Sequence, residues 1–269
     1  MILLPQSTKH VDFYSSNETR IFVVGDIHGC YDELFLALRA INFDFNRDIL
    51  FSLGDIVDRG TDDYRCMSLQ LEPWFKQILG NHEAIHLHNF LEHPGNGTHW
   101  AIHPDQSNDP EYRSFLARCS NLPHVAVIDD RFVLVHAALP MISYSGRAKV
   151  VDIKQTLLEY EFYTSLYRPD PTLWDISYLQ SPYSATLPGI DYVFHGHYIL
   201  PQVTTKGKSV YLDTGFMSPV FSKSSTNKLS FALLGDVPTY YTVSVDFGRQ
   251  AIVSVEVNNV HHISPSSYW

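Results

Sequence analysis

The chain has 269 residues, a formal net charge of −10 and a hydrophobic content of 45%. That content suffices for a sizeable buried core. The acidic charge argues against general binding to nucleic acid or to an anionic membrane surface, since both need basic patches.

The N-terminal residues and the cysteines indicate the cellular setting. The apolar stretch in MILLPQSTKH is far too short for a signal peptide, and no segment approaches the ~20 apolar residues of a membrane span. Cys30, Cys66 and Cys119 are widely spaced and form no CxxC pair, which predicts free thiols in a reducing compartment. We therefore expect a soluble cytoplasmic protein.

The first third of the chain alternates between the patterns of strands and of helices. Short apolar runs that end at glycine predict strands, and the stretches between them space their apolar residues as a helix does. The predicted strands are 21–25, 48–54 and 74–79, and the predicted helices are 31–41, 62–71 and 82–90. Alternation of this kind is typical of βαβ units and a parallel sheet.

The remainder of the chain is richer in strand patterns. Segments on either side of Asp129-Asp130-Arg131 look like the arms of a hairpin. Residues 143–190 have a mixed pattern that allows helices, and prolines interrupt it. We predict strands at 125–128, 132–135, 192–195 and 209–213, and several more over 228–257. The pattern indicates an α/β half joined to a second, more antiparallel sheet, with residues 1–269 in a single domain.

Polar motifs follow each of the first three predicted strands. They are GDIHG over 25–29, GDIVDRG over 54–60 and GNHE over 80–83. Ligands of open α/β sheets bind outside the carboxyl ends of the strands. A single Gly-Asp after a strand is most often only a turn, but three such motifs in sequence order indicate a site. It would gather Asp26, His28, Asp55, Asp58, Arg59, Asn81 and His82.

The residue types in these motifs indicate a metal centre. Aspartate, histidine and asparagine without thiolate suit Mn²⁺, Fe or Zn better than a structural cysteine-type zinc site. One aspartate can bridge two metal ions, which is the arrangement used for in-line phosphoryl displacement. His136 and His197 end later predicted strands, and we expect them to complete the coordination of a second ion.

A second metal motif overlaps the third strand end. Residues 82–86 read HEAIH, the H-E-x-x-H pattern of zinc metalloproteases. However, His82 falls at the start of its predicted helix, and no HExxHxxGxxH continuation supplies a third ligand. We therefore favour the GNHE interpretation and expect His86, His88 and His93 on a polar helix face or at a pocket rim.

The motif set resembles the phosphoprotein phosphatase (PPP) family of metallophosphoesterases, in particular its bacterial and phage branch. The segments that carry the resemblance are GDIHGCYDEL, FSLGDIVDRG, PWFKQILGNHE, VLVHA, FHGH and YLDTG. The resemblance runs from about residue 21 to 234 and is weakest between 92 and 190. It implies a metallophosphoesterase-type β-sandwich of two mixed sheets flanked by helices.

The resemblance also implies two divalent metal ions, with Mn²⁺ expected first and Fe or Zn as alternatives. A hydroxide bridging them would attack phosphorus in line. On the matching positions, Asp26 and His28 would hold one ion, Asp55 would bridge both, and Asn81, His136 and His197 would hold the second. His82 would be the general acid, Asp58 would position it, and Arg59 would grip the phosphate, with Asn81 and His82 also facing the substrate.

The sequence departs from the family pattern near residue 176. Relatives commonly carry an arginine in a Leu-Trp-x-Arg stretch, whereas this chain has Leu173-Trp174-Asp175-Ile176. Losing that contact weakens phosphate binding, by an expected ~2–4 kcal/mol in the transition state. Arg147 or Arg168 is a candidate replacement from the same region. His195, beside the last metal motif, is expected to pack in the core.

The resemblance implies a metal-dependent protein serine/threonine phosphatase, with phosphotyrosine open as a further substrate. A dinucleoside tetraphosphate hydrolase is the alternative, although that family typically reads GNHD where this chain has Glu83. A non-catalytic module that binds phosphate or metal is the second alternative. The expected partner is a phosphorylated protein or a small phosphomonoester, and the oligomeric state stays open.

Overall fold

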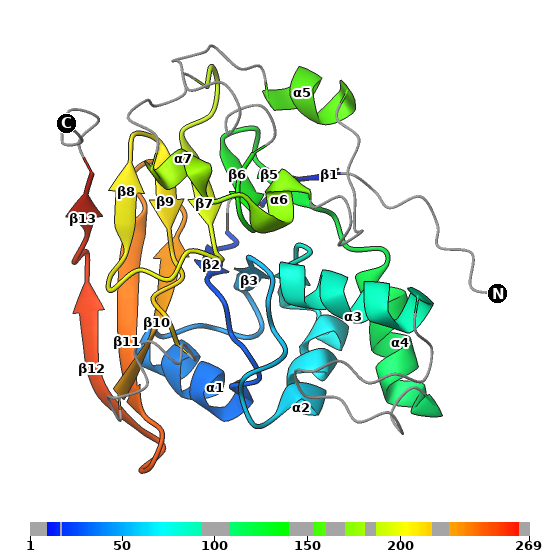
Figure 1. Ribbon diagram of the computed structural model, residues 1–269. Coiled ribbons are helices and arrows are strands. Elements are labelled where there is room, and N and C mark those ends of the chain that lie inside the picture. Colours follow the sequence, from blue (N-terminus) through cyan, green and yellow to red (C-terminus); the bar gives the residue numbers. More distant parts are fainter. Residues whose placement is uncertain are drawn as a thin grey trace.

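The computed structural model describes residues 10–16, 18–92, 108–139, 153–159, 170–180, 187–216 and 226–263. Two β-sheets pack against each other, and helices flank them (Figure 1). Both sheets contain parallel and antiparallel pairs. The predicted fold of two mixed sheets with flanking helices is therefore confirmed.

The six-stranded sheet contains the three strands that precede the polar motifs. Its order is β12-β11-β10-β2-β3-β4, and β2, β3 and β4 are parallel neighbours. The bounds are β2 Ile21–Val24, β3 Ile49–Ser52, β4 Phe75–Gln77, β10 Thr226–Leu233, β11 Thr239–Asp246 and β12 Ala251–Val257.

The C-terminal strands correct one prediction from the sequence. They extend the sheet of the first half, because β10 pairs antiparallel with β2, placing Phe231 beside Val24. They do not form a separate antiparallel sheet. The physical reason is that β2 is buried along its whole length and needs a hydrogen-bonded neighbour on each side.

The seven-stranded sheet has the order β1-β5-β6-β7-β9-β8-β13. The predicted hairpin of β5 and β6 is present, and β6 and β7 are parallel neighbours. Three short strands, β1, β8 and β13, had no clear sequence pattern. The bounds are β1 His10–Phe13, β5 Val125–Ile128, β6 Phe132–Val135, β7 Tyr192–His195, β8 Thr204–Lys206, β9 Ser209–Tyr211 and β13 His261–His262.

Helix α4 has no counterpart among the helices predicted from the sequence. Helix α4 is capped by Asp109, whose side chain accepts hydrogen bonds from the backbone N–H groups of Glu111 and Tyr112. Pro110 at its first turn completes a helix-start signal that the sequence shows. The helices are α1 Tyr31–Ala40, α2 Asp63–Ser68, α3 Asn81–Glu92, α4 Pro110–Cys119, α5 Ile153–Glu159, α6 Pro171–Trp174 and α7 Ser177–Gln180, with a 3-10 turn η1 Leu69–Leu71.

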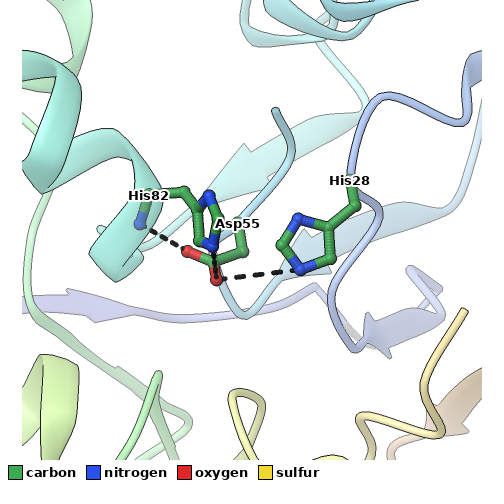
Figure 2. Close-up of side chains that lie close together, drawn as sticks. All are labelled: His28, Asp55 and His82. Carbon is green, nitrogen blue, oxygen red and sulfur yellow. Dashed lines mark hydrogen bonds and ion pairs between the residues drawn. The ribbon is translucent and has the colours of Figure 1, made fainter. Parts of the chain in front are cut away.

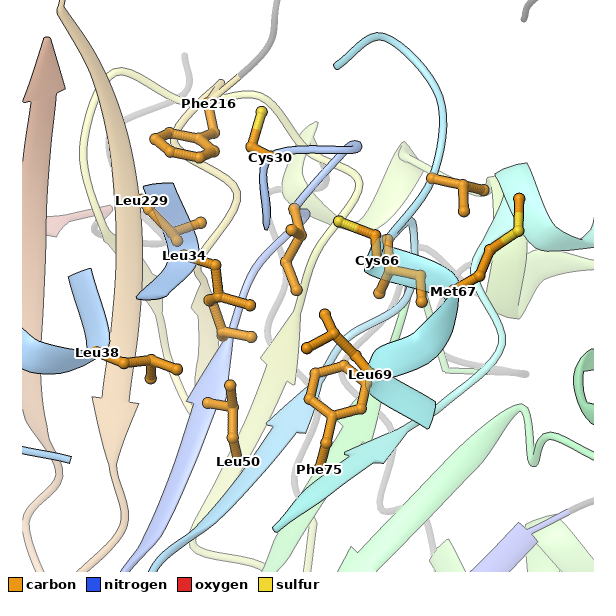
Figure 3. Packing of buried hydrophobic residues seen from close by; sticks show 14 of the residues in the cluster. Cys30, Leu34, Leu38, Leu50, Cys66, Met67, Leu69, Phe75, Phe216 and Leu229 are labelled. Atoms are coloured by element: carbon orange, nitrogen blue, oxygen red, sulfur yellow. The ribbon is translucent and has the colours of Figure 1, made fainter. Parts of the chain in front are cut away.

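The largest core lies between the six-stranded sheet and the helices that cover its outer face. Figure 3 shows Leu34 and Leu38 of α1 near Leu50 of β3, and Met67 of α2 further away in the same cluster. The three cysteines are free, as predicted, and all are buried. A second core lies between the two sheets, and it fixes β3 of one sheet against β6 and β7 of the other. Across the described residues, no helix is both long and apolar enough to cross a bilayer.

Candidate active site

The polar motifs meet where strands of both sheets end. The loops after the adjacent parallel strands β2, β3 and β4 supply Asp26, His28 and Asp55 and lead into α3. The loops after β6 and β7, in the other sheet, supply His136 and His197. The predicted ligands are buried, apart from His197, which is half-buried. They come together as the three strand-end motifs and the two later histidines predict.

Tight turns present these side chains. His28, Asp55 and His197 have φ values of +49°, +51° and +60°, a left-handed conformation that costs free energy in residues other than glycine. The Asp55 turn is held from both sides. Its N–H and that of Ile56 donate to the buried Glu83 carboxylate, both at 2.9 Å, and its C=O accepts from His28 N at 2.9 Å.

Asp55 is the centre of the site. Its Oδ1 accepts a hydrogen bond from the backbone N–H of His82 at 2.9 Å. Its Oδ2 faces three imidazoles, at 3.5 Å from His136 Nε2, 3.8 Å from His82 Nε2 and 3.9 Å from His28 Nε2. Figure 2 shows His28 and His82 on either side of this carboxylate. Burial by itself would raise the pKa of Asp55, but the surrounding imidazoles lower it below its usual value.

His28 has a buried nitrogen lone pair that receives no hydrogen bond. Its Nδ1 lies 3.0 Å from the Val57 carbonyl, which can only accept, so Nδ1 carries the proton. Nε2 is then the bare nitrogen, and it is buried without a hydrogen-bond partner, 3.8 Å from Asp26 Oδ2. Burial lowers the pKa of His28 to about 3, so it stays neutral. A divalent cation bound by Asp26, His28 and Asp55 fits this arrangement.

His136 repeats this arrangement on the other side of Asp55. Its Nδ1 lies 2.7 Å from the Leu53 carbonyl, which places the lone pair on Nε2, 2.7 Å from Asn81 Oδ1. His197 Nδ1 lies 2.9 Å from the same oxygen. Burial lowers the pKa of His136, and that of His197 to about 3. Neutral nitrogens and oxygens that face one another at such distances suit a second cation, with Asp55 shared.

A further carboxylate, not assigned from the sequence, lies beside Asp26. Asp213 follows β9, and its Oδ2 is buried without a hydrogen-bond partner. Burial, followed by the charges of Asp213 and Asp55, raises the pKa of Asp26 well above its usual value. The concentration of buried carboxylates therefore favours bound positive charge at this end of the site.

His82 and Asp58 form a hydrogen-bonded pair at the substrate side. His82 Nδ1 donates to Asp58 Oδ2 at 2.6 Å. Burial lowers the pKa of His82, but the carboxylates of Asp55 and Asp58 outweigh that effect and raise it overall. The exposed Arg59 brings its Nη2 to 3.2 Å from His82 Nε2. These three side chains lie close together, as the motifs GDIVDRG and GNHE predict.

The expectations about four other histidines have different outcomes. His86 is fully buried and bonds to Asp58, so placing it on a polar face or rim was wrong, and the same holds for the buried His88. His195 is buried and bonds to the Ala137 carbonyl at 2.6 Å and to Ser209 Oγ at 3.1 Å, which fits core packing. His93 lies outside the described residues.

The region where the resemblance predicts an arginine is described only in part. Ile176 is 46% exposed. Two residues before it, the Trp174 ring lies edge-on to the candidate ligand His197, with 6.3 Å between ring centroids. The candidate replacements Arg147 and Arg168 lie outside the described residues, so their contribution stays a prediction.

Comparisons with known proteins agree with this geometry. The model of the calcineurin-like phosphoesterase family matches residues 19–200. Serine/threonine-protein phosphatase 2 of Salmonella typhimurium is 31% identical over 218 residues, which cover 77% of this chain and 92% of that protein. A symmetrical bis(5'-nucleosyl)-tetraphosphatase of Actinobacillus pleuropneumoniae is 44% identical, but over 68 residues that cover 24% of this chain and 25% of that protein.

A solved structure shows the same fold. A cold-active protein-tyrosine phosphatase from a Shewanella species superposes with a TM-score of 0.54 at 16% identity, covering 93% of this chain and 83% of that one. At this identity the similarity concerns the fold alone. The family match spans every strand-end motif up to FHGH, and on that basis the chain belongs to the calcineurin-like phosphoesterases.

Proposed function

We propose that this protein is a metal-dependent phosphomonoesterase and, within that class, a protein serine/threonine phosphatase. The observation that carries the proposal is the convergence of three imidazoles on one carboxylate oxygen, Asp55 Oδ2, at 3.5 to 3.9 Å. These distances are too long for hydrogen bonds and leave space for cations between nitrogen and oxygen. The unpartnered Nε2 of His28 supports the same interpretation.

The proposed metal ligands form two groups that share Asp55. Asp26 and His28 complete the first group, and Asn81, His136 and His197 complete the second. The mixture of carboxylate, imidazole and amide oxygen favours Mn²⁺, with Fe or Zn as alternatives. Bound divalent ions would supply Lewis acidity, which lowers the pKa of water and neutralises charge on phosphoryl oxygens.

The protein's own side chains have separate proposed roles. His82 donates the proton on Nε2 to the departing oxygen, a contribution typically worth ~10²–10⁴-fold in rate. Asp58 accepts the hydrogen bond from Nδ1–H and stabilises the protonated imidazolium, which carries the transferable proton on Nε2. Arg59, exposed beside His82, grips an oxygen of the phosphate.

The extent of the relatives favours a protein substrate. The serine/threonine phosphatase of S. typhimurium matches this chain over most of both lengths, whereas the tetraphosphatase of A. pleuropneumoniae matches about a quarter of each. Glu83 also favours the phosphatase, because the tetraphosphatase family typically has an aspartate at this position. A dinucleoside tetraphosphate hydrolase stays the second candidate, since that local identity is the higher one. The complete set of candidate ligands argues against a non-catalytic module.

The test uses p-nitrophenyl phosphate and chelator-treated protein. We expect activity to return with Mn²⁺, and Asp55→Asn to lower it by about a hundredfold or more, because the shared ligand is lost. The matched control is Asp236→Asn, whose side chain is 94% exposed and far from the site in its ion pair with Arg131. Wild-type protein without activity under Mn²⁺, Fe²⁺ and Zn²⁺ would exclude the proposal.

A substrate panel then separates the candidates. Phosphoserine, phosphothreonine and phosphotyrosine peptides are compared with diadenosine tetraphosphate at equal concentration. We expect the highest kcat/KM on phosphoserine or phosphothreonine peptides. A preference for diadenosine tetraphosphate would establish the second candidate. The buried, free thiols support the expectation of a reducing compartment such as the cytoplasm.

A further inference from the structure

The second histidine of the HEAIH stretch has a specific partner. His86 follows His82 by one turn of α3, and residues four apart share a helix face, so both imidazoles point to the same side. Between them lies the carboxylate of Asp58. His82 Nδ1 is 2.6 Å from Oδ2, and His86 Nε2 is 3.0 Å from Oδ1. The spacing that holds a zinc ion in metalloproteases here holds a carboxylate.

The direction of each hydrogen bond follows from the chemistry of the groups. A carboxylate can only accept, so His86 Nε2 carries a proton that it donates to Asp58. A neutral imidazole then has its lone pair on Nδ1, which lies 3.0 Å from the Tyr112 hydroxyl of α4. Burial raises the pKa of Tyr112, so its hydroxyl keeps its proton and donates. Tyr112, His86 and Asp58 therefore form one chain that ends at His82.

The hydrogen bond from His86 matters because a single bond, from His82, would leave the Asp58 carboxylate free to rotate. The terminal torsion of aspartate has a broad energy minimum, so one hydrogen bond does not fix the plane of the carboxylate. Two donors on one rigid helix fix both oxygens. Asp58 also lies in a left-handed turn, with φ +69°. Its N–H donates to Asp63 Oδ1 at 2.9 Å and its C=O accepts from Gly60 N–H at 2.8 Å, but these bonds hold the backbone and not the carboxylate. The side-chain orientation thus depends on His82 and His86.

We propose that His86 is a positioning residue for the general acid, acting through Asp58 with support from Tyr112. All four groups are buried, with exposed fractions of 0% for His86 and Asp58, 4% for His82 and 5% for Tyr112. Removing His86 leaves Asp58 Oδ1 buried without this donor, which is costly and lets the carboxylate turn away from His82. The proposal rests on the proposed function, in which His82 protonates the leaving oxygen.

The test compares two substrates that differ in how much they need the acid. Phenyl phosphate and p-nitrophenyl phosphate have the same ring, but the phenolate is the more basic leaving group and depends more on protonation. We expect His86→Leu to lower kcat on phenyl phosphate by about 10- to 100-fold and on p-nitrophenyl phosphate by about 3-fold or less, with KM nearly unchanged. Tyr112→Phe should give a smaller loss in the same direction.

Two further variants separate positioning from general damage. His86→Gln keeps a side-chain N–H donor and should recover most of the phenyl phosphate activity. His262→Gln makes the same change at an exposed histidine of β13, which bonds to Thr205, and should leave both substrates unaffected. An equal loss on both substrates in His86→Leu, or no rescue by His86→Gln, would overturn the proposal.

A second measurement needs no turnover. The proton between His82 Nδ1 and Asp58 should give a low-field NMR signal, assigned through its absence in Asp58→Asn. We expect this signal to shift or broaden in His86→Leu and to be retained in His86→Gln. An unchanged signal in both variants would overturn the proposal, even in a protein without phosphatase activity. Activity of the wild type on either substrate separately decides the proposed function.

Discussion

At the scale of single residues, Ile176 stands where the family resemblance predicts an arginine. Its side chain is 46% exposed, and its segment is tied to the site by Trp174 against His197 and by the Tyr198 hydroxyl, which donates to the Asp175 carbonyl at 3.1 Å. An exposed isoleucine gains little from this location. Replacing Ile176 should therefore cost little stability, so a substitution there can test its effect on phosphate binding.

We expect Ile176→Arg to lower KM for p-nitrophenyl phosphate and to raise kcat/KM by about tenfold, because a charge-assisted contact to phosphate is worth ~1.5–3 kcal/mol. Steady-state kinetics measure the change. Ile176→Gln has a similar length without the charge and should change kcat/KM little. If the arginine variant has an unchanged KM, residue 176 does not face the phosphate, and Arg147 or Arg168 becomes the better candidate.

At the scale of elements, the close approach of two strand ends positions the ligands. A Cβ at Gly80 would overlap the backbone nitrogen and Oδ1 of Asp55 and would crowd Glu83 Oε2 at 2.7 Å. Helix α3 starts directly after this glycine, and its Glu83 holds the Asp55 turn. The junction of β3, β4 and α3 therefore tolerates no side chain at this position.

We expect Gly80→Ala to lower the free energy of unfolding by ~1–3 kcal/mol through overpacking. It should also lower Mn²⁺-dependent phosphatase activity by about tenfold or more, because Asp55 is displaced. Urea denaturation and the p-nitrophenyl phosphate assay measure the two effects. Gly235→Ala is the matched control, since a Cβ there meets only the Val237 carbonyl at 3.6 Å. Native-like activity in Gly80→Ala would contradict the expectation.

At the scale of the whole molecule, we propose that residues 1–269 form one domain, because both sheets contribute to a shared core. Phe51 of the six-stranded sheet and Leu53, which follows β3, pack with Leu134 and Phe194 of the seven-stranded sheet. Calorimetry should then show one cooperative unfolding transition. Two separate transitions would contradict the single domain.

The buried His124 should make this transition depend on pH. It bonds to Thr172 Oγ1 at 2.9 Å, and burial lowers its pKa to about 4. Below pH ~6.5 the unfolded chain takes up a proton that the folded protein excludes, so stability falls as pH falls from ~6.5 towards 4. The loss approaches ~3 kcal/mol at pH 4.

Unfolding of wild type and His124→Gln between pH 7.5 and 4.5 measures this contribution. The stability difference between the two proteins should shrink as pH falls, because only the wild type loses the histidine term. A difference that stays constant over this range would show that His124 is protonated in the folded state as readily as in the unfolded one.

Local patterns determined much of this protein by themselves. The runs before Gly25, Gly54 and Gly80 form the predicted strands β2, β3 and β4, and the motif residues that follow them lie at one edge. The prediction succeeded because a strand that ends in a glycine turn is a local property, and because neighbouring parallel strands carry their ends to the same place.

Other features were decided only by the tertiary structure. Three contacts depend on segments that lie far apart in the chain. They are the pairing of β10 with β2, the bond of His86 to Asp58, and the bond of Glu83 to the Asp55 turn. The sequence HEAIH is the same whether its histidines bind a zinc ion or a carboxylate. Their partner Asp58 comes from the loop after β3. The packing of that loop against α3 therefore decides that the two histidines bind a carboxylate, and no local sequence pattern predicts this packing.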